Sequence, residues 1–113
     1  MDVERARQLV GRERARIERS LAELRPDADD ELSHLDQHPA DAGSELFTQE
    51  RDAGLVQRLL EELAAVERAE ARIEAGTYGK SIESGEPIPD ARLEAMPLAE
   101  RTVQEQSRLE RGG

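Results

Sequence analysis

The charge of this chain is concentrated in one segment. Residues 26–50 hold eight acidic side chains and no lysine or arginine, whereas residues 1–25, 51–75 and 76–113 carry net charges of +2, −2 and −2. Together with the −8 of the acidic segment, these values give the −10 of the whole chain. Because crowded like charges repel one another, we expect this segment to lie exposed at one end of the fold. Its acids are Asp27, Asp29, Asp30, Glu31, Asp36, Asp41, Glu45 and Glu50.

Helical patterns flank the acidic segment on both sides. Before it, apolar residues recur every seven positions, with two leucines beside them: Val3, Val10, Ile17 and Leu24, with Leu9 and Leu21. This spacing draws a narrow apolar stripe along a helix, which is typical of packing against a single partner helix. Pro26 ends this helix, because the residue before a proline is driven out of the helical conformation.

A second and longer helix is predicted from about residue 45 to residue 75. Its apolar face combines a heptad series with neighbouring positions: Leu59, Val66 and Ile73, then Val56 and Leu63, then Leu55, Leu60 and Ala69. Asp41 or Ser44 is a suitable N-cap for this helix, and Gly76 ends it. We expect Phe47 either to lock the hairpin near its tip or to contact a partner.

These patterns predict an all-α fold in three parts. Residues 1–75 form a long antiparallel helical hairpin, a coiled coil whose acidic tip lies at about residues 26–50. Residues 76–106 form a small C-terminal lobe, because glycines and prolines are frequent there and apolar positions are closely spaced. Residues 107–113 form a C-terminal tail. The lobe has few apolar residues, and lobes of this size usually need a metal or a disulfide.

Composition narrows the possible functions. The chain has no cysteine, so disulfides and thiolate metal sites are excluded. With 36% hydrophobic and 37% charged residues, it has material for only a thin apolar seam. Its acidity argues against direct binding to nucleic acid, since glutamates interrupt the arginines of the first helix. We expect a cytoplasmic monomer without a membrane span, signal peptide or cofactor.

Residues 76–106, GTYGKSIESGEPIPDARLEAMPLAERTVQEQ, resemble the C-terminal zinc finger of the DksA/TraR family of bacterial transcription regulators. The family pattern is G-x-Y-G-x-C-x-x-C-G-x-x-I-x-x-x-R-L-x-A-x-P, followed by a second C-x-x-C. The residues in register with it are Gly76, Tyr78, Gly79, Gly85, Ile88, Arg92, Leu93, Ala95 and Pro97. The resemblance implies that Arg92 anchors the lobe internally.

The departure from the family pattern lies at its metal ligands. The four family cysteines fall on Ser81, Ser84, Thr102 and Glu105. Structural zinc sites use thiolate or imidazole ligands, so this lobe resembles a zinc finger without its metal ligands. Hydroxyl groups can instead accept hydrogen bonds from the turn amides. His34 and His38 are four residues apart, but Pro39 and their distance from the lobe favour exposed loop histidines over metal ligands.

The resemblance extends to the hairpin tip. Family members that act on RNA polymerase carry a D-x-x-D-x-A motif between their two helices. In this chain Asp41 and Ala42 supply an aspartate and an alanine there, His38 replaces the first aspartate, and Asp36 and Glu45 lie nearby. The string HPADAGSELF resembles the YteA-like branch of the family. Asp36, His38, Asp41, Ala42 and Glu45 are the predicted partner-binding tip.

The function that the resemblance implies is regulation of transcription. The hairpin would bind RNA polymerase through its secondary channel and deliver acidic groups near the catalytic centre. The alternative is a structural or adaptor coiled coil that associates through exposed seam positions such as Val10 and Leu59. An enzyme is not expected, because the chain has no pairing of nucleophile with base and no Gly-rich phosphate loop.

Overall fold

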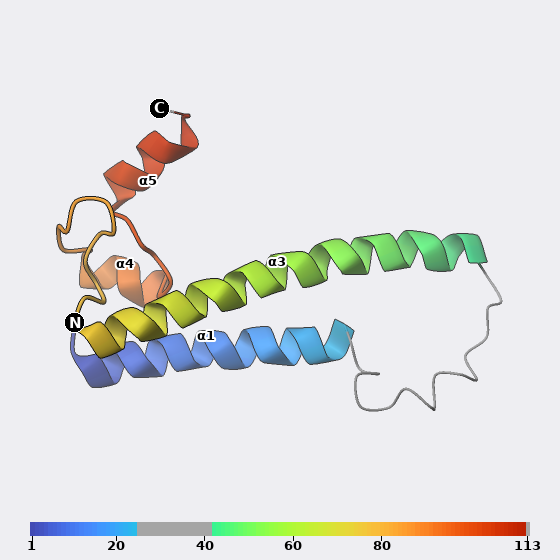
Figure 1. Ribbon diagram of the computed structural model, residues 1–113, viewed down its shortest axis with the longest axis horizontal. Helices are drawn as coiled ribbons and strands as arrows, with labels where there is room; N and C mark the ends of the chain where they lie inside the picture. Colours follow the sequence, from blue (N-terminus) through green and yellow to red (C-terminus); the bar gives the residue numbers. More distant parts are fainter. Residues whose placement is uncertain (25–41, 113) are drawn as a thin grey trace. The chain divides into compact units, whose positions relative to one another are not determined.

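In a computed structural model, the described part of the chain is largely helical. The structure describes the backbone of residues 1–24 and 42–112, and the side chains of residues 1–24 and 51–112. The helices are α1 (Val3–Leu24), α3 (Ala42–Ala75), α4 (Asp90–Ala95) and α5 (Val103–Glu110), as Figure 1 shows. Within those residues, extended backbone pairs only at an isolated antiparallel bridge between Lys80 and Pro87. The predicted all-α class is confirmed.

The chain divides into two compact units, each of which contains part of α1 and part of α3. The first unit comprises Met1–Arg14 and Ala65–Gly113, and the second comprises Ala15–Ala64. In the first unit, Val3 and Ala6 lie near Gly76, whereas Arg14 of the next turns pairs with Glu70. Residue numbers therefore rise along α1 as they fall along α3, which is the antiparallel pairing that the sequence predicts.

In the first unit, five apolar side chains of α1 and α3 are buried. They are Ala6, Leu9 and Val10 of α1 with Val66 and Ala69 of α3. In the second unit, Ile17 and Leu59 are buried, and an Arg16 Nη2 to Glu62 Oε1 ion pair of 2.7 Å joins the two helices. Both units thus confirm a helical hairpin with a narrow apolar seam.

Two predicted seam positions are exposed instead. Val3 is 48% exposed, because it is the first residue of α1 and lies beside Gly76, where α3 has already ended. Leu60 is 39% exposed, since it follows the buried Leu59 and so points about 100° away from it around the helix. The sequence pattern overstated the width of the seam at these two positions.

Helix α3 ends where the glycine pattern predicts. Gly76 has a φ of +78°, the left-handed conformation that glycine adopts at low cost. The amides of Gly76 and Thr77 donate to the carbonyls of Ile73 and Arg72, at 3.2 and 2.8 Å. This pair of hydrogen bonds is a Schellman motif, and it redirects the chain from the hairpin into the lobe.

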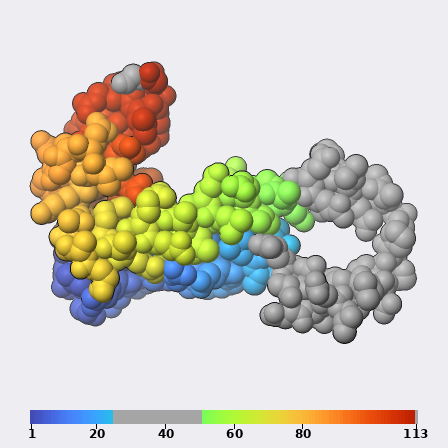
Figure 2. Space-filling model, in the orientation of Figure 1, coloured from blue at the N-terminus to red at the C-terminus, as the bar shows by residue number. Residues whose placement is uncertain are grey.

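The lobe follows, coloured orange to red in Figure 2. Ile88 and Leu93 are its buried apolar residues. Gly79, with a φ of +87°, would place an added Cβ 3.4 Å from Leu93 Cδ1, so a side chain there would crowd this core. The lobe contains two short helices, α4 and α5. Because α5 runs through Glu110, the predicted division between lobe and tail after residue 106 falls within a helix.

In the segments 1–24 and 42–112, none of the helices is both long enough and apolar enough to cross a membrane.

Candidate functional site

The structure brings Ser81, Ser84, Thr102 and Glu105 together in the lobe. Ser81 Oγ donates to Glu105 Oε1 at 2.6 Å, and Ser84 Oγ donates to Glu105 Oε2 at 2.5 Å. The backbone amide of Thr102 donates to Glu105 Oε1 at 2.9 Å. Ser81 and Glu105 are only 5% and 6% exposed. We call these four residues the carboxylate cluster, because the Glu105 carboxylate is the acceptor shared by the other three.

The serine hydroxyls also bind the turn that carries them. Ser81 Oγ accepts from the amides of Glu83 and Ser84, at 3.0 and 3.2 Å. Ser84 Oγ accepts from the amide of Glu86 at 3.2 Å. Because each hydroxyl donates to Glu105 while it accepts from the backbone, the turn and the carboxylate fix one another.

Glu105 also begins helix α5. Thr102 Oγ1 accepts from the Glu105 amide at 3.2 Å while the Glu105 carboxylate accepts from the Thr102 amide, which makes a capping box. Hydrogen bonds from Ser81, Ser84 and Thr102 lower the pKa of Glu105 to about 2. The T-x-x-E spacing of residues 102–105 is the capping-box signature, and it could have revealed this role from the sequence alone.

The carboxylate cluster does not fit the zinc that a C4-type finger implies. Its side chains are three neutral hydroxyls and one carboxylate, whereas structural zinc sites use thiolates and imidazoles. Both Glu105 oxygens are already engaged by hydrogen-bond donors. Among the residues whose side chains are described, no group of three or more His, Cys, Asp or Glu residues could hold a metal ion.

Ion pairs attach the lobe to the helices of the first unit. Glu100 Oε2 lies 2.9 Å from Arg68 Nε and 2.9 Å from Arg72 Nη1 of α3. Burial would raise the pKa of Glu100, but the hydrogen bonds from the two arginines outweigh it and the pKa is lowered. Arg5 of α1 holds Glu94 with a pair of hydrogen bonds, at 2.8 and 2.6 Å. Sequence reasoning missed both contacts.

Arg92 and Tyr78 hold the lobe from within. Arg92 Nε donates to the Arg101 carbonyl at 3.0 Å, which confirms the internal anchoring predicted for this arginine. The Tyr78 hydroxyl donates to the Pro97 carbonyl at 2.7 Å. Burial raises the pKa of the Tyr78 hydroxyl. Tyr78 is the only tyrosine of the chain, and there is no tryptophan, so the intrinsic fluorescence arises from a residue of the lobe that also lies near Val3 and Ala6 of α1.

The structure describes the side chains of none of the five predicted tip residues. Asp36, His38 and Asp41 fall outside the described residues. Ala42 and Glu45 lie in the first turns of α3, where only the backbone is described. The five tip residues therefore remain a prediction.

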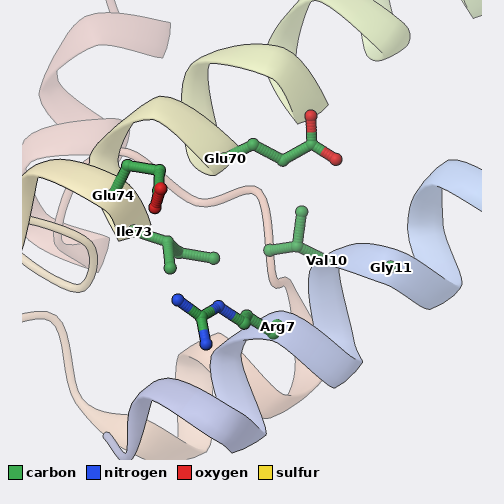
Figure 3. Close-up of a pocket in the computed structure, with 6 residues that line it drawn as sticks. All are labelled: Arg7, Val10, Gly11, Glu70, Ile73 and Glu74. Carbon is green, nitrogen blue, oxygen red and sulfur yellow. The ribbon is translucent and has the colours of Figure 1, made fainter.

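A groove lies between α1 and α3 in the first unit (Figure 3). It has a volume of about 410 Å³, and its lining residues are Arg7, Val10, Gly11, Glu70, Ile73 and Glu74. Val10 and Ile73 give it an apolar floor. Glu70 is held by Arg14 at 2.8 Å, and Arg7 pairs with Glu4 at 3.2 Å.

Comparison with known proteins supports the resemblance in the lobe. The family model of the prokaryotic dksA/traR C4-type zinc finger matches residues 76–111. An uncharacterized protein, YteA from Bacillus subtilis, is 45% identical over 69 residues, which cover 61% of this chain and 29% of YteA. The RNA polymerase-binding transcription factor DksA of Caulobacter vibrioides is 41% identical over 71 residues, covering 63% of this chain and 45% of that protein.

A solved structure extends the likeness to the helices. The structure of transcription factor DksA2 from Pseudomonas aeruginosa superposes with a TM-score of 0.61 at 26% identity, covering 92% of this chain and 84% of that one. Together, the family model, the two relatives and this structure support a protein of the DksA/TraR family. Its lack of cysteine fits the branch of the family without zinc ligands. The chain spans less than half of the length of the YteA and DksA relatives.

Proposed function

We propose that this protein regulates transcription by binding the core enzyme of RNA polymerase in the cytoplasm. The hairpin enters the secondary channel of the polymerase, and the tip residues Asp36, His38, Asp41, Ala42 and Glu45 lie near the catalytic centre. The observation that carries the proposal is the likeness to a family whose Caulobacter member is named for polymerase binding. The partner is a protein, and the interaction requires neither direct contact with nucleic acid nor a second copy of the chain.

The antiparallel pairing of α1 and α3 supports this geometry. The acidic segment comprises most of the connection between the two helices together with the first turns of α3, and the helices pair with one another within each unit. A helix pair can enter an opening too narrow for a globular domain, since each helix is about 10 Å across. The eight carboxylates of residues 26–50 are suited to a basic channel that leads to metal ions.

The alternative of a self-associating adaptor loses its main support. It placed Val10 and Leu59 on exposed parts of the seam, but these side chains are only 1% and 9% exposed within the single chain. Both are covered by the chain's own helices, so neither offers an apolar surface to another copy. That prediction is wrong for these two residues.

The tip is tested by removing one charge. We expect Asp41→Asn to abolish the effect of the protein on transcription by purified polymerase while it leaves helix content unchanged. Asp52→Asn, which removes an acid of α3 beyond the acidic segment, serves as the matched control and keeps the effect. A fully active Asp41→Asn variant would remove Asp41 from the tip mechanism.

A further inference from the structure

We propose that the Glu105 carboxylate replaces the metal ion of the related zinc fingers as the cross-link that holds the lobe together. The proposal concerns how the lobe folds and is independent of any polymerase partner. It starts from the disagreement between a family defined by a C4-type zinc finger and a lobe whose corresponding residues do not fit zinc.

The contacts of Glu105 join parts of the lobe that are far apart in sequence. Ser81 and Ser84 lie in the turn after Gly79, 24 and 21 residues before Glu105. Thr102 and Glu105 lie at the start of α5. A structural metal ion connects two such segments by binding ligands from each. Here one carboxylate connects them by accepting hydrogen bonds from each.

The lobe has little else to connect these segments. Its buried apolar side chains are Ile88 and Leu93, and α5 buries only Glu105. The other polar contacts of the turn with the segment before α5 or with α5 itself are the Ile82 amide on the Glu100 carbonyl, at 2.9 Å, and the exposed pairs of Glu83 with Arg101, at 3.1 Å, and with Arg108, at 3.6 Å. A small lobe with so limited an apolar core requires an additional cross-link.

The carboxylate cluster can stabilise the ionised Glu105 side chain without a neighbouring cation. Hydrogen bonds to an ionised acceptor are about twice as strong as those between neutral groups. The helix α5 adds the positive end of its dipole, because Glu105 lies in its first turn. A buried carboxylate with three donors is therefore stabilised without a metal or a basic side chain, and the lobe needs neither metal nor thiol chemistry to fold.

The first test compares the folding of the lobe with and without a chelator. Tyrosine fluorescence follows the lobe through Tyr78, and circular dichroism at 222 nm follows the helices. We expect EDTA to leave the unfolding midpoint of the Tyr78 signal unchanged. A lower midpoint in EDTA that is restored by zinc would overturn the proposal.

The second test changes the carboxylate itself. We expect Glu105→Ala to abolish the native Tyr78 signal while most of the helical signal of α1 and α3 remains. Glu105→Gln should keep the native signal, because its amide oxygen still accepts from Ser81 and Thr102 and its amide group can donate to Ser84. Glu86→Gln, a change to an exposed side chain of the same turn, is the control. Native Tyr78 fluorescence in Glu105→Ala would contradict the proposal.

The third test restores the metal site. If the cluster occupies the position of the metal, the combined change Ser81→Cys, Ser84→Cys, Thr102→Cys and Glu105→Cys converts the lobe to a zinc-dependent fold. We expect this variant to bind Co²⁺ with the absorption bands of a tetrahedral thiolate site and to lose the Tyr78 signal in EDTA. A reduced variant that folds equally well in EDTA would show that the cross-link is not needed.

Discussion

Glu105 shows how much one side chain contributes to the lobe. Its pKa is about 2 in the folded protein, because Ser81, Ser84 and Thr102 donate hydrogen bonds to the ionised form. In an unfolded chain a glutamate titrates near pH 4.3. A carboxylate with a lowered folded pKa stabilises the fold above its unfolded pKa and loses that contribution as the pH falls toward the folded pKa.

The lowered pKa of Glu105 predicts how the stability of the protein changes at acidic pH. Between pH 7 and about pH 5, the difference in unfolding free energy between the wild type and Glu105→Gln should stay constant. Below about pH 4.5 the wild type should lose stability relative to the variant, because only the wild type takes up a proton at this site on unfolding. Urea unfolding between pH 2 and 7, monitored by Tyr78 fluorescence, measures the unfolding free energies of the wild type and of Glu105→Gln. The other acids titrate in both proteins, so a difference that does not change with pH would contradict the assigned cause.

Glu100 is the second residue whose removal should affect the lobe. Its carboxylate lies between Arg68 and Arg72, and the Arg72 Nε is buried without a hydrogen-bond partner. Glu100→Ala would leave Arg72, 15% exposed, without its anion. We expect a loss of about 1–3 kcal/mol in the free energy of unfolding, measured by urea titration.

Glu94→Ala is the matched control for Glu100→Ala, because it breaks the exposed pair with Arg5. Exposed ion pairs contribute little to stability, so this change should have a much smaller effect. Equal losses in the two variants would show that the burial of Glu100 does not determine its contribution.

At the scale of the elements, substitutions of two glycines test the account of helices α1 and α3. Gly76 has a φ of +78° at the end of α3, whereas Gly11 lies inside α1 with nothing within 4 Å of an added Cβ. Gly76→Ala should destabilise the protein by about 1–2 kcal/mol, because L residues are strained in the left-handed conformation. Gly11→Ala should stabilise it by about 0.5–1 kcal/mol, because alanine favours the helix. Thermal unfolding at 222 nm measures both, and changes of the same sign would contradict this account of the helices.

The elements were largely predictable from the sequence, because their signals are local. Val10, Ile17 and Val66 lie on heptad series and are buried, and Gly76 ends α3 as its residue type predicts. The ion pairs that attach the lobe were not predictable. Arg5 and Glu94 are 89 residues apart, and only the folded arrangement shows that they meet.

The carboxylate cluster was predictable from the sequence only in part. Family spacing predicted which four residues replace the cysteines, and the hydroxyl groups were expected to bind turn amides. The central position of Glu105 was not predicted, because its contacts with Ser81 and Ser84 join segments 24 and 21 residues apart. The capping box between Thr102 and Glu105 is visible in the sequence, but the approach of Ser81 and Ser84 to the same carboxylate depends on the fold of the lobe.

At the scale of the whole molecule, the distribution of charge supports the proposal that the protein binds RNA polymerase. Residues 1–25, 51–75 and 76–113 carry nearly balanced charges, while residues 26–50 carry −8. A protein that presents its negative charge in one segment is suited to a partner with a basic opening. Binding of this kind should weaken as salt rises, because mobile ions screen exposed charges.

The central claim is tested most directly by binding to the core enzyme of Caulobacter RNA polymerase in competition with Caulobacter DksA. A fluorophore on Gly112→Cys labels a chain that has no other cysteine. We predict that fluorescence anisotropy rises on addition of the core enzyme at low salt and falls again as unlabelled DksA displaces the labelled chain. If anisotropy does not rise, or if saturating DksA leaves the labelled chain bound, the proposal that this protein uses the polymerase site of DksA is contradicted.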